Sequence, residues 1–429
     1  MREMKDSGIE WIGQIPERWQ LRRAKTLFTQ RNSKGNKVEV LLSPTQKYGV
    51  VPQSQLEGVV QVKEDTDLQM FKTIHKGDFV ISLRSFQGGF EYSLYEGVCS
   101  PAYQVFYPIT PICDLYYRYL FKSQSFISKM NNITVGIREG KNIQYIDFAN
   151  SQIPVPPIAE QERIAAFLDA ECAEIDAVLE KTRASIEEYK KLKQAVITQA
   201  VTKGVCGDRP MKDSGIEWIG EIPESWEVSS VRYIGQLQNG ISKGGEFFGK
   251  GFPFVSYGDV YKNYELPHSI SGLIDTTEDE RATYSVEYGD IFFTRTSETI
   301  EEVGFSCVCK RSIPNATFAG FIIRLRPFCA DEKILTDYAK YYFRGEHIRA
   351  YLVKEMNLVT RASLGQTLLK GMSVIVPPKS VQKEIAEYLD DKCADIDALV
   401  AKKQQYLTEI ENYKKSLIYE YVTGKKEVV

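Results

Sequence analysis

Apolar side chains recur at spacings of three, four or seven positions over two long stretches of the chain, which predicts two long amphipathic helices. Their positions are Ile164, Leu168, Cys172, Ile175, Leu179, Ile186 and Tyr189 in the first stretch and Ile385, Leu389, Cys393, Ile396, Val400, Leu407 and Ile410 in the second. One constant offset separates the two sets, so the same apolar stripe, called the seam below, is present twice. We expect the helices to pair as a coiled coil rather than pack singly, each on its own domain. The predicted contact residues are Ile175, Leu179, Ile186, Tyr189, Ile396, Val400, Leu407 and Ile410.

The rest of the chain alternates in the manner of strands. Runs such as KVEVLLSPT, DFVISLR, GDIFFTRT and FAGFIIRLRP are typical of half-buried strands, and helical patches such as LYYRYLFKSQSFISKMN follow them. A Gly-Asp turn precedes a strand in both halves, at Lys76–Asp78 and at Tyr288–Asp290. These patterns predict two mixed α/β heads, each joined to its long helix by a proline-rich stop at 153–157 or 374–378.

Two blocks of sequence occur once in each half of the chain. MKDSGIEWIGQIPERW at Met4–Trp19 returns as MKDSGIEWIGEIPESW at Met211–Trp226, and the helix opening at Val155 returns in degraded form at Val376. The segments between these blocks are largely unrelated, which indicates a common scaffold that carries two different recognition surfaces. We interpret the tryptophans of the repeated block as packing anchors: Trp11, Trp19, Trp218 and Trp226.

This duplication predicts an α+β fold with tandem pseudo-twofold symmetry. Because each copy runs from head to helix, a twofold axis sets the two long helices antiparallel in a coiled coil, with the two globular heads at opposite ends. The predicted domains are the first head with its repeated block, the first helix, the second head with its repeated block and the second helix: 1–154, 155–206, 207–375 and 376–429.

Charge is distributed unevenly along the 429 residues, whose net charge is −3. The first variable segment, 20–155, holds 16 basic and 11 acidic residues, whereas 227–375 holds 17 and 18. The first head is therefore able to bind phosphate unaided, while the second needs grouped basic residues or a basic partner.

No apolar run is long enough for a membrane helix or a secretory signal, so we expect a cytoplasmic protein. Three histidines and no CxxC pair argue against a zinc site.

The repeated blocks resemble the specificity subunit of Type I restriction-modification systems. The resemblance rests on DSGIEWIGxIPExW, on the helix opening PPxxEQxRIAxFLD at Pro156–Asp169, and on AVTKG and YVTGK from Ala200 and Tyr421. It covers the whole chain in order. The second copy departs from the pattern at the helix start, where it has Ser380, Val381, Gln382 and Lys383 in place of Ala159, Glu160, Gln161 and Glu162.

The resemblance implies a non-catalytic subunit that joins two methyltransferase subunits, which use S-adenosylmethionine. Restriction or translocase subunits, which use ATP and Mg²⁺, can join the same complex. Each variable head then corresponds to a target recognition domain that reads one half of a bipartite, asymmetric double-stranded DNA site. The helices correspond to the family's spacer regions and set the unread gap between the two halves. No cofactor is expected in this chain.

Polar residues that follow strands in both heads are the candidates for reading DNA bases, because arginine, glutamine and asparagine make bidentate contacts to base edges. They occupy matching places in the two heads. One group follows the strand that comes directly after the Gly-Asp turn, and the other lies just before the chain leaves the head for the long helix. In the first head they are Arg84, Ser85, Gln87, Arg138, Lys141, Asn142 and Gln144, and in the second Arg295, Thr296, Ser297, Thr360, Arg361, Ser363 and Gln366.

Two other functions remain open at this stage. A stand-alone nuclease or methyltransferase is disfavoured because the chain contains no NPPY or DPPY tetrad, no glycine-rich nucleotide loop and no P-loop. A coiled-coil scaffold whose heads bind proteins is the alternative to DNA recognition. The recognised bases cannot be deduced, because side chains on loops follow no fixed code.

Overall fold

The structure is a computed structural model that describes residues 2–34, 40–56, 68–82, 89–133, 143–207, 209–297, 303–356 and 362–428. Its contacts form two compact units. Unit 1 comprises Met1–Arg183 and Gln405–Val429, and unit 2 comprises Ala184–Gln404. Each unit therefore contains one head and part of both long helices. None of the described helices has the length and apolar character needed to cross a membrane.

The described residues of unit 1 form twelve strands and three short α-helices in addition to the long helix that begins there. The strands are β1 (Met4–Asp6), β2 (Gln14–Pro16), β3 (Gln20–Arg23), β4 (Phe28–Arg31), β5 (Leu42–Thr45), β6 (Gly49–Pro52), β7 (Lys72–Ile74), β8 (Phe79–Ile81), β9 (Phe90–Tyr92), β10 (Gly97–Cys99), β11 (Gln104–Pro108) and β12 (Gln152–Val155) among the described residues. The helices are α1 (Asp114–Lys122), α2 (Gln124–Ile133), α3 (Tyr145–Asn150) and the long α4 (Ile158–Lys203).

Unit 2 repeats this plan with additions. Its described strands are β13 (Met211–Asp213), β14 (Glu221–Pro223), β15 (Glu227–Ser230), β16 (Gly235–Asn239), β17 (Phe248–Val255), β18 (Leu273–Ile274), β19 (Ile291–Thr294), β20 (Thr296–Ser297), β21 (Ser306–Val308), β22 (Thr317–Phe318), β23 (Ile322–Pro327), β24 (Ala362–Ser363) and β25 (Ser373–Val376). Its helices are α5 (Tyr257–Lys262), α6 (Glu278–Thr283), α7 (Thr336–Tyr342), α8 (Glu346–Glu355), α9 (Gln366–Gly371) and the long α10 (Lys379–Val422).

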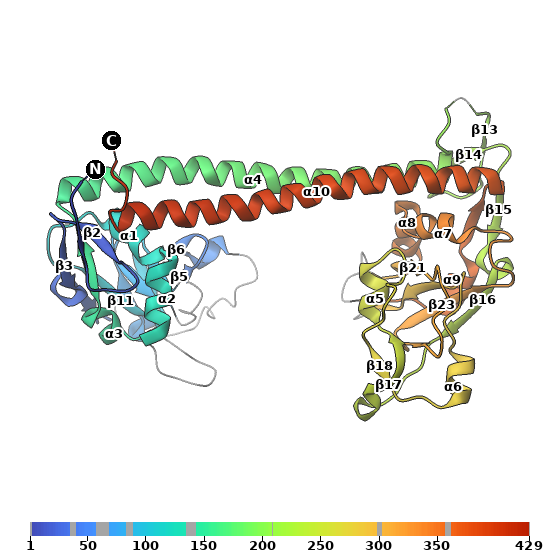
Figure 1. The fold of residues 1–429 in the computed structure, drawn as a ribbon, viewed down its shortest axis with the longest axis horizontal. Coiled ribbons are helices and arrows are strands. Elements are labelled where there is room, and N and C mark those ends of the chain that lie inside the picture. The colour runs from blue at the N-terminus through green and yellow to red at the C-terminus, as the bar shows by residue number, and fades with distance from the viewer. Residues whose placement is uncertain are drawn as a thin grey trace. The chain divides into compact units, whose positions relative to one another are not determined.

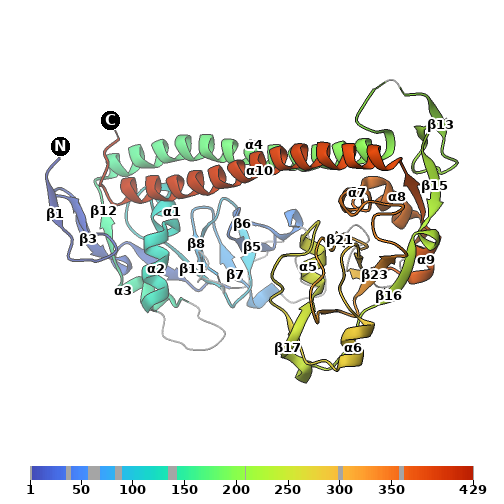
Figure 2. The same cartoon turned by 45° about the vertical axis from the view of Figure 1, so that its right-hand side comes forward.

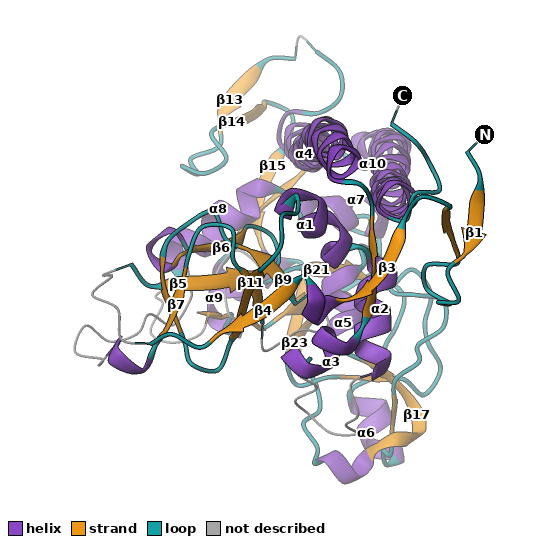
Figure 3. Ribbon diagram, turned by 90° about the vertical axis from the view of Figure 1, so that its left-hand side faces the viewer, coloured by secondary structure: helices purple, strands orange, loops and turns teal. Residues whose placement is uncertain are grey.

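The two heads share one sheet topology despite their unrelated sequences. A four-stranded sheet has the order β4-β11-β8-β9 in unit 1 and β16-β23-β19-β21 in unit 2. The repeated block forms a hairpin in both units, β1-β2 and β13-β14, and the strand that leads into each head pairs with the strand that leaves it, β3 with β12 and β15 with β25. In Figure 3 the strands β4, β11 and β9 of the first sheet and β23 and β21 of the second can be followed. The prediction of a common scaffold under two divergent heads is confirmed.

The Gly-Asp turn has the same construction in both heads. Gly77 and Gly289 have φ angles of +95° and +87°, which glycine adopts without the clash of a Cβ atom. The carboxylate of Asp78 then accepts the backbone N–H of His75, and that of Asp290 accepts the N–H of Glu287, each at 2.8 Å. This shared construction supports common descent of the two heads.

An arginine neutralises each of these buried carboxylates, but it comes from a different strand in each head. Arg31 of β4 donates to Asp78, and Arg326 of β23 donates to Asp290 with two nitrogens, at 2.7 and 2.6 Å. Burial nevertheless raises the pKa of Asp290. The heads have therefore kept the turn and replaced the residue that balances its charge.

The long helices lie side by side and antiparallel within each unit (Figure 1). In unit 1 the start of α4 faces the end of α10, where Asp176 accepts from Lys414 at 2.6 Å. In unit 2 the end of α4 faces the start of α10, where Lys193 donates to Asp397 at 2.6 Å. The predicted pair of antiparallel helices is confirmed, together with the mixed α and β content of the fold.

The eight predicted contact residues all lie at buried or half-buried positions of these helices. Buried are Leu179, Ile186 and Ile396; half-buried are Ile175, Tyr189, Val400, Leu407 and Ile410. The earlier residues of the same seam serve the heads as well, because they belong to the head cores: Ile164, Leu168 and Cys172 in unit 1, Ile385, Leu389 and Cys393 in unit 2.

Each head is bonded to both long helices. One helix of each head lies against the helix pair, α1 in unit 1 and α7 in unit 2 (Figure 2). Tyr119 of α1 donates to Asp169 of α4 at 2.6 Å, and Tyr341 of α7 donates to Asp390 of α10 at 2.7 Å. One turn earlier, the Tyr116 hydroxyl donates to the Val422 carbonyl at the end of α10. The Tyr338 hydroxyl likewise donates to a backbone carbonyl near the end of α4. The head is thus held by the start of its own helix and by the end of the other.

The two copies differ in sequence at the start of the long helix, and this difference changes the hydrogen bonding of a buried tryptophan. Trp19 and Trp226 are fully buried, which confirms them as packing anchors. The Trp19 indole N–H donates to Glu160 at 2.9 Å, and Arg2 donates to the other oxygen of that carboxylate at 2.5 Å. Val381 stands in the place of Glu160 in unit 2, and no described residue accepts the Trp226 N–H. The departure from the family pattern therefore removes an acceptor inside the protein.

We expect Glu160→Val to lower the free energy of unfolding of unit 1 by about 2 kcal/mol, because hydrogen bonds to a charged group contribute roughly 1.5–3 kcal/mol each. Native-state hydrogen exchange of the segment around Trp19 measures this directly. The control is Glu162→Val, since Glu162 is exposed on the same helical turn. Equal loss of protection in both variants would show that the bonds to Trp19 and Arg2 contribute nothing.

Candidate nucleic-acid interface

Two of the predicted polar clusters in the second head meet in the structure. The strand β19 ends at Thr294 and continues through Arg295 into the short strand β20, which pairs antiparallel with β24. Thr296 lies opposite Ser363, and Ser297 lies opposite Ala362. Segments more than sixty residues apart in the sequence are thus joined into one small ribbon at the end of the central strand.

Arg295 is the residue on which this ribbon is anchored. Its carbonyl accepts the backbone N–H of Leu364 at 2.7 Å, and its own N–H donates to the carbonyl of Phe321 at 2.9 Å. Leu364 is fully buried, so it fixes the ribbon to the head while Ser363 beside it stays exposed. The backbone of Arg295 is therefore held on both sides, and its side chain is half-buried.

Gln366 lies two residues beyond Leu364, at the first position of α9, and is half-buried. The structure thus brings Arg295, Thr296, Ser363 and Gln366 into one region of the second head. Thr360 and Arg361 lie outside the described residues, and the side chain of Ser297 is not described either. Guanidinium, amide and hydroxyl groups in one region can donate to and accept from base edges.

The corresponding region of the first head is described only in part. Arg84, Ser85, Gln87, Arg138, Lys141 and Asn142 lie outside the described residues. Gln144 is exposed, and its amide oxygen accepts from the side chain of Gln104 at 3.2 Å. Gln104 pairs with Ile81 at the end of β8, the same end of the central strand as the ribbon occupies in the second head.

An exposed aromatic residue next to Arg295 was missed by sequence analysis. Phe321, whose carbonyl accepts the Arg295 N–H, is 63% exposed. The run FAGFIIRLRP predicts a strand throughout, but its strand begins only at Ile322 and a turn precedes it. The signal that was available is Gly320, since a glycine inside a strand pattern often marks a turn or an interruption of the strand.

Several arginines of the second head are used inside the protein. Arg344 donates to the carbonyls of Ser306 and Asn263, each at 2.6 Å, and burial lowers its pKa. Burial also lowers the pKa of Arg349, to about 10. Arg324 and Arg326 bond within the sheet and its turn. The near-neutral charge of this head therefore overstates the positive charge that it offers to a ligand.

Across the ranges that the structure describes, no group of three or more His, Cys, Asp or Glu side chains is placed to hold a metal ion. The recognisable chemistry of the ribbon is hydrogen bonding, from the side chains of Arg295, Thr296, Ser363 and Gln366.

Both halves of the chain match one protein-family model, described as the Type I restriction modification DNA specificity domain, over residues 14–188 and 223–411. The chain is 25% identical over 310 residues to the Type I restriction enzyme EcoKI specificity subunit of Escherichia coli K12; the match covers 71% of this chain and 64% of that protein. It is 25% identical over 450 residues to the putative Type I restriction enzyme MjaX specificity subunit of Methanocaldococcus jannaschii, covering 97% and 96%.

The fold also has a counterpart among solved structures. A chain from a study of complex assembly and conformational transition of the type I R-M system superposes with a TM-score of 0.72 at 15% sequence identity. The superposition covers 96% of this chain and 99% of that one. At this identity the likeness concerns the fold alone.

Proposed function

Since the chain belongs to the Type I restriction modification DNA specificity family, whose model matches both of its halves, we propose that it selects the DNA target of a Type I restriction-modification complex. It reads a bipartite, asymmetric site in double-stranded DNA and does not itself catalyse methylation or cleavage. The first head, with the repeated block before it (1–154), reads one half of the site. The second (207–375) reads the other half.

One observation of the structure carries this proposal. Two heads with the same sheet order present different polar residues at the same end of the central strand. In the second head this is where β20 and β24 bring Arg295 and Thr296 beside Ser363. A constant frame with variable polar residues at one place is what a family of sequence readers requires, because base contacts specify the sequence while the frame positions them.

The partners of the chain follow from the same proposal. Two methyltransferase subunits, which use S-adenosylmethionine, bind the chain and modify the site that it selects. Restriction subunits, which use ATP and Mg²⁺, join the same complex. The long helices α4 and α10 serve as the spacer between the two heads and thereby set the unread gap of the site.

The methyltransferase subunits also supply much of the positive charge that grips DNA. The second head has no excess of basic residues, and Arg324, Arg326, Arg344 and Arg349 are engaged internally. Phosphate contacts supply most of the non-specific affinity of DNA-binding proteins. The isolated subunit is therefore expected to bind its site more weakly than the assembled complex does.

Methylation mapping tests target selection. DNA from cells that express the chain with its cognate methyltransferase is sequenced by a long-read method that detects methylated adenine, and cells with the methyltransferase alone serve as the control. We expect a bipartite motif that is methylated only when the chain is present. Exchanging residues 20–153 for the segment of another family member should change one half of the motif and leave the other half intact.

Two results would contradict the proposal. If the complex forms and no new motif is methylated, the chain is an assembly scaffold whose heads bind proteins. If the exchange of 20–153 alters both halves together, the two heads do not read independently.

A further inference from the structure

A phenylalanine ring is exposed on a turn beside Arg295 in the second head. Phe321 is 63% exposed, although the residues on both sides of it, 316–320 and 322–325, are all buried. A ring at such a place would be expected to turn inward with its neighbours, because burial of apolar surface stabilises the fold. Its exposure therefore calls for a role outside the head.

Hydrogen bonds on both sides fix the backbone of this turn. Gly320 donates its N–H to the Ile241 carbonyl at 2.8 Å, and the Phe321 carbonyl accepts the Arg295 N–H at 2.9 Å. A side chain that is presented from a fixed backbone loses little conformational freedom on binding. The Phe321 ring is thus suited to contact a ligand at a defined place next to Arg295.

The first head has a different residue at the same place. Phe106 in the first head and Leu325 in the second both face the first strand residue after the Gly-Asp turn. Four residues before them lie Ala102 and Phe321, and both are exposed. The two heads therefore share the position and differ in the side chain that it carries.

The turn is also closed in the same way in both heads. The Tyr103 N–H donates to the Ser100 carbonyl at 3.1 Å, and the Ile322 N–H donates to the Ala319 carbonyl at 3.0 Å. In each head the exposed residue comes directly before the donor of this bond. A constant turn with a variable exposed residue is the arrangement expected of a position that determines specificity.

We propose that Phe321 reads the C5-methyl group of a thymine in the half-site of the second head, close to the base pair that Arg295 contacts. This role rests on the proposed function, since it takes the region around β20 and β24 as the DNA-reading surface. The methyl group is the apolar feature that thymine presents in the major groove, and phenylalanine is one of the side chains that contact it there.

The surroundings of Phe321 favour the major groove over insertion between bases. That groove admits a two-stranded ribbon such as the one that β20 and β24 form, and arginine and glutamine distinguish base pairs there. Apolar side chains that are inserted between base steps act from the minor groove instead. A phenylalanine beside a ribbon of this kind therefore meets base edges, among which the thymine methyl group is its apolar partner.

The sheet register places the thymine relative to Arg295. The pairing in which Thr294 faces Ile322 continues by one residue, so that Arg295 and Phe321 are neighbours across the strands. Side chains opposite each other in a sheet have Cβ atoms about 4.5–5.5 Å apart, and base pairs follow one another at about 3.4 Å. The thymine is therefore expected within about two base pairs of the one that Arg295 contacts.

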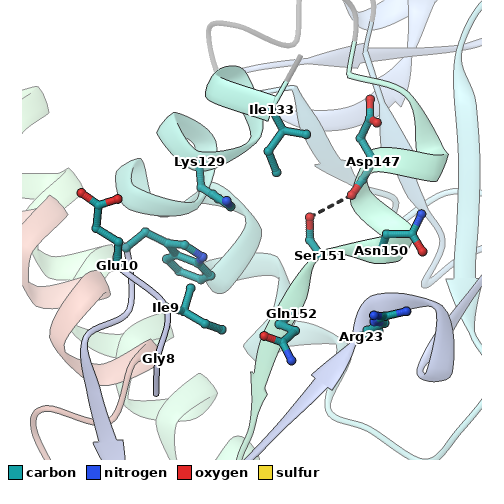
Figure 4. Close-up of a pocket in the computed structure, with 11 residues that line it drawn as sticks. Gly8, Ile9, Glu10, Arg23, Lys129, Ile133, Asp147, Asn150, Ser151 and Gln152 are labelled. Atoms are coloured by element: carbon teal, nitrogen blue, oxygen red, sulfur yellow. Dashed lines mark hydrogen bonds between the residues drawn. The ribbon is translucent and has the colours of Figure 1, made fainter. Parts of the chain in front are cut away.

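Trp11 in unit 1 also lies at an open surface, but its ring is used inside the protein. It lines a cavity of about 560 Å³ whose wall carries charges of both signs, among them Glu10 and Lys129 (Figure 4). Phe126 of α2 packs against the Trp11 indole with ring centroids 5.6 Å apart. Trp11 thus holds the hairpin of the repeated block to the head, whereas Phe321 keeps most of its surface exposed.

Replacement of single thymines by deoxyuridine tests the proposal without changing the protein. Deoxyuridine keeps the hydrogen-bonding groups of thymine and lacks only the methyl group. The chain, assembled with its methyltransferase subunits, binds its mapped site, and each thymine on either strand is replaced in turn within the half that the exchange of 20–153 leaves intact. We expect one position at which the replacement weakens binding about fourfold, the effect of losing one buried methyl group.

Phe321→Ala should abolish this dependence on the methyl group. We expect the variant to bind the native site about tenfold more weakly, because the ring is no longer buried against DNA, and to bind the deoxyuridine site equally well. The turn should fold with alanine, which the first head has at this place. Phe328→Ala is the matched control, because Phe328 is also 63% exposed and follows the other end of β23. It should leave the affinity and the deoxyuridine effect unchanged.

Four results would overturn the role of Phe321 and leave target selection intact. They are specific binding that no deoxyuridine replacement weakens, a half-site without an A·T pair, a deoxyuridine effect that persists in Phe321→Ala, and an equal loss of affinity in Phe328→Ala. A ring that acts as a wedge gives the first of these together with weaker binding by Phe321→Ala. Failure of the proposed function looks different, because the complex then binds its mapped site no more tightly than a scrambled duplex.

Discussion

Arg295→Ala combined with Gln366→Ala is expected to weaken specific DNA binding by the assembled complex by about 100-fold. A well-formed bidentate contact between a side chain and a base discriminates by roughly 1–3 kcal/mol, which is about 5- to 150-fold in affinity. Arginine and glutamine are the residues of the described ribbon that can make such contacts. The loss should concern one half of the bipartite site, because both residues belong to the second head.

The backbone of the ribbon should survive this double change. Leu364 and Phe321 bond to the main chain of Arg295, and Thr296 pairs with Ser363 through β20 and β24. None of these bonds uses the side chains that are removed. The variant therefore tests the reading groups without dismantling the frame that presents them.

Arg311→Ala provides a matched control for the loss of one guanidinium. Arg311 is exposed and lies close in sequence to Ser312, whose hydroxyl accepts from Tyr288 of the Gly-Asp turn, at the start of β19 rather than at its end. Binding of the native site and of sites substituted in each half is compared by competition at fixed salt concentration. The assignment fails if Arg311→Ala weakens binding as much, or if the double variant loses affinity equally for all sequences.

Repetition and periodicity made the scaffold predictable. Every position of the seam from Ile164 to Tyr189 has a counterpart in the second half, and such a long coincidence has no explanation other than duplicated helices. The Gly-Asp turn was readable for a similar reason, since Gly77 and Gly289 occupy a conformation that other residues rarely adopt. Local chemistry determines these features, and a single sequence contains it.

The remainder depended on contacts between distant residues. Pairing of Thr296 with Ser363 requires the chain to return across a whole head, and no local pattern reports such a pairing. The arginines of the second head show the same limit. Arg326 counts toward the basic residues of this head in the sequence, yet Asp290 holds it, because a buried carboxylate needs a cation nearby.

His347→Phe is expected to make unit 2 less sensitive to acid. His347 is buried in α8 with its ring centroid 4.7 Å from that of Tyr342, and burial lowers its pKa from 6.5 to about 3. Neither ring nitrogen has a hydrogen-bond partner among the described residues. The folded state therefore holds a neutral imidazole that the unfolded state would protonate below pH 6.5.

The sign of the effect follows from proton uptake. Above pH 6.5 both states are neutral at this residue, and its contribution does not vary with pH. Between pH 6.5 and about 3 only the unfolded state binds the proton, so folding stability falls by about 1.4 kcal/mol for each pH unit. At pH 5 the native protein should have lost about 2 kcal/mol through this residue, and the phenylalanine variant should have lost none of it.

Denaturant unfolding from pH 7.5 to pH 4.5 measures the difference in folding stability between the native protein and His347→Phe. Hydrogen exchange of α8 then reports on unit 2 separately. Other carboxylates titrate in this range, but they are present in both proteins and cancel when the native curve is subtracted from the variant curve. His75→Phe in unit 1 is the control, because the side chain of His75 is 44% exposed, whereas that of His347 is buried. Parallel curves for the native protein and His347→Phe would mean that the imidazole is protonated inside the fold, and its burial would then need a buried anion or water that pairs with it.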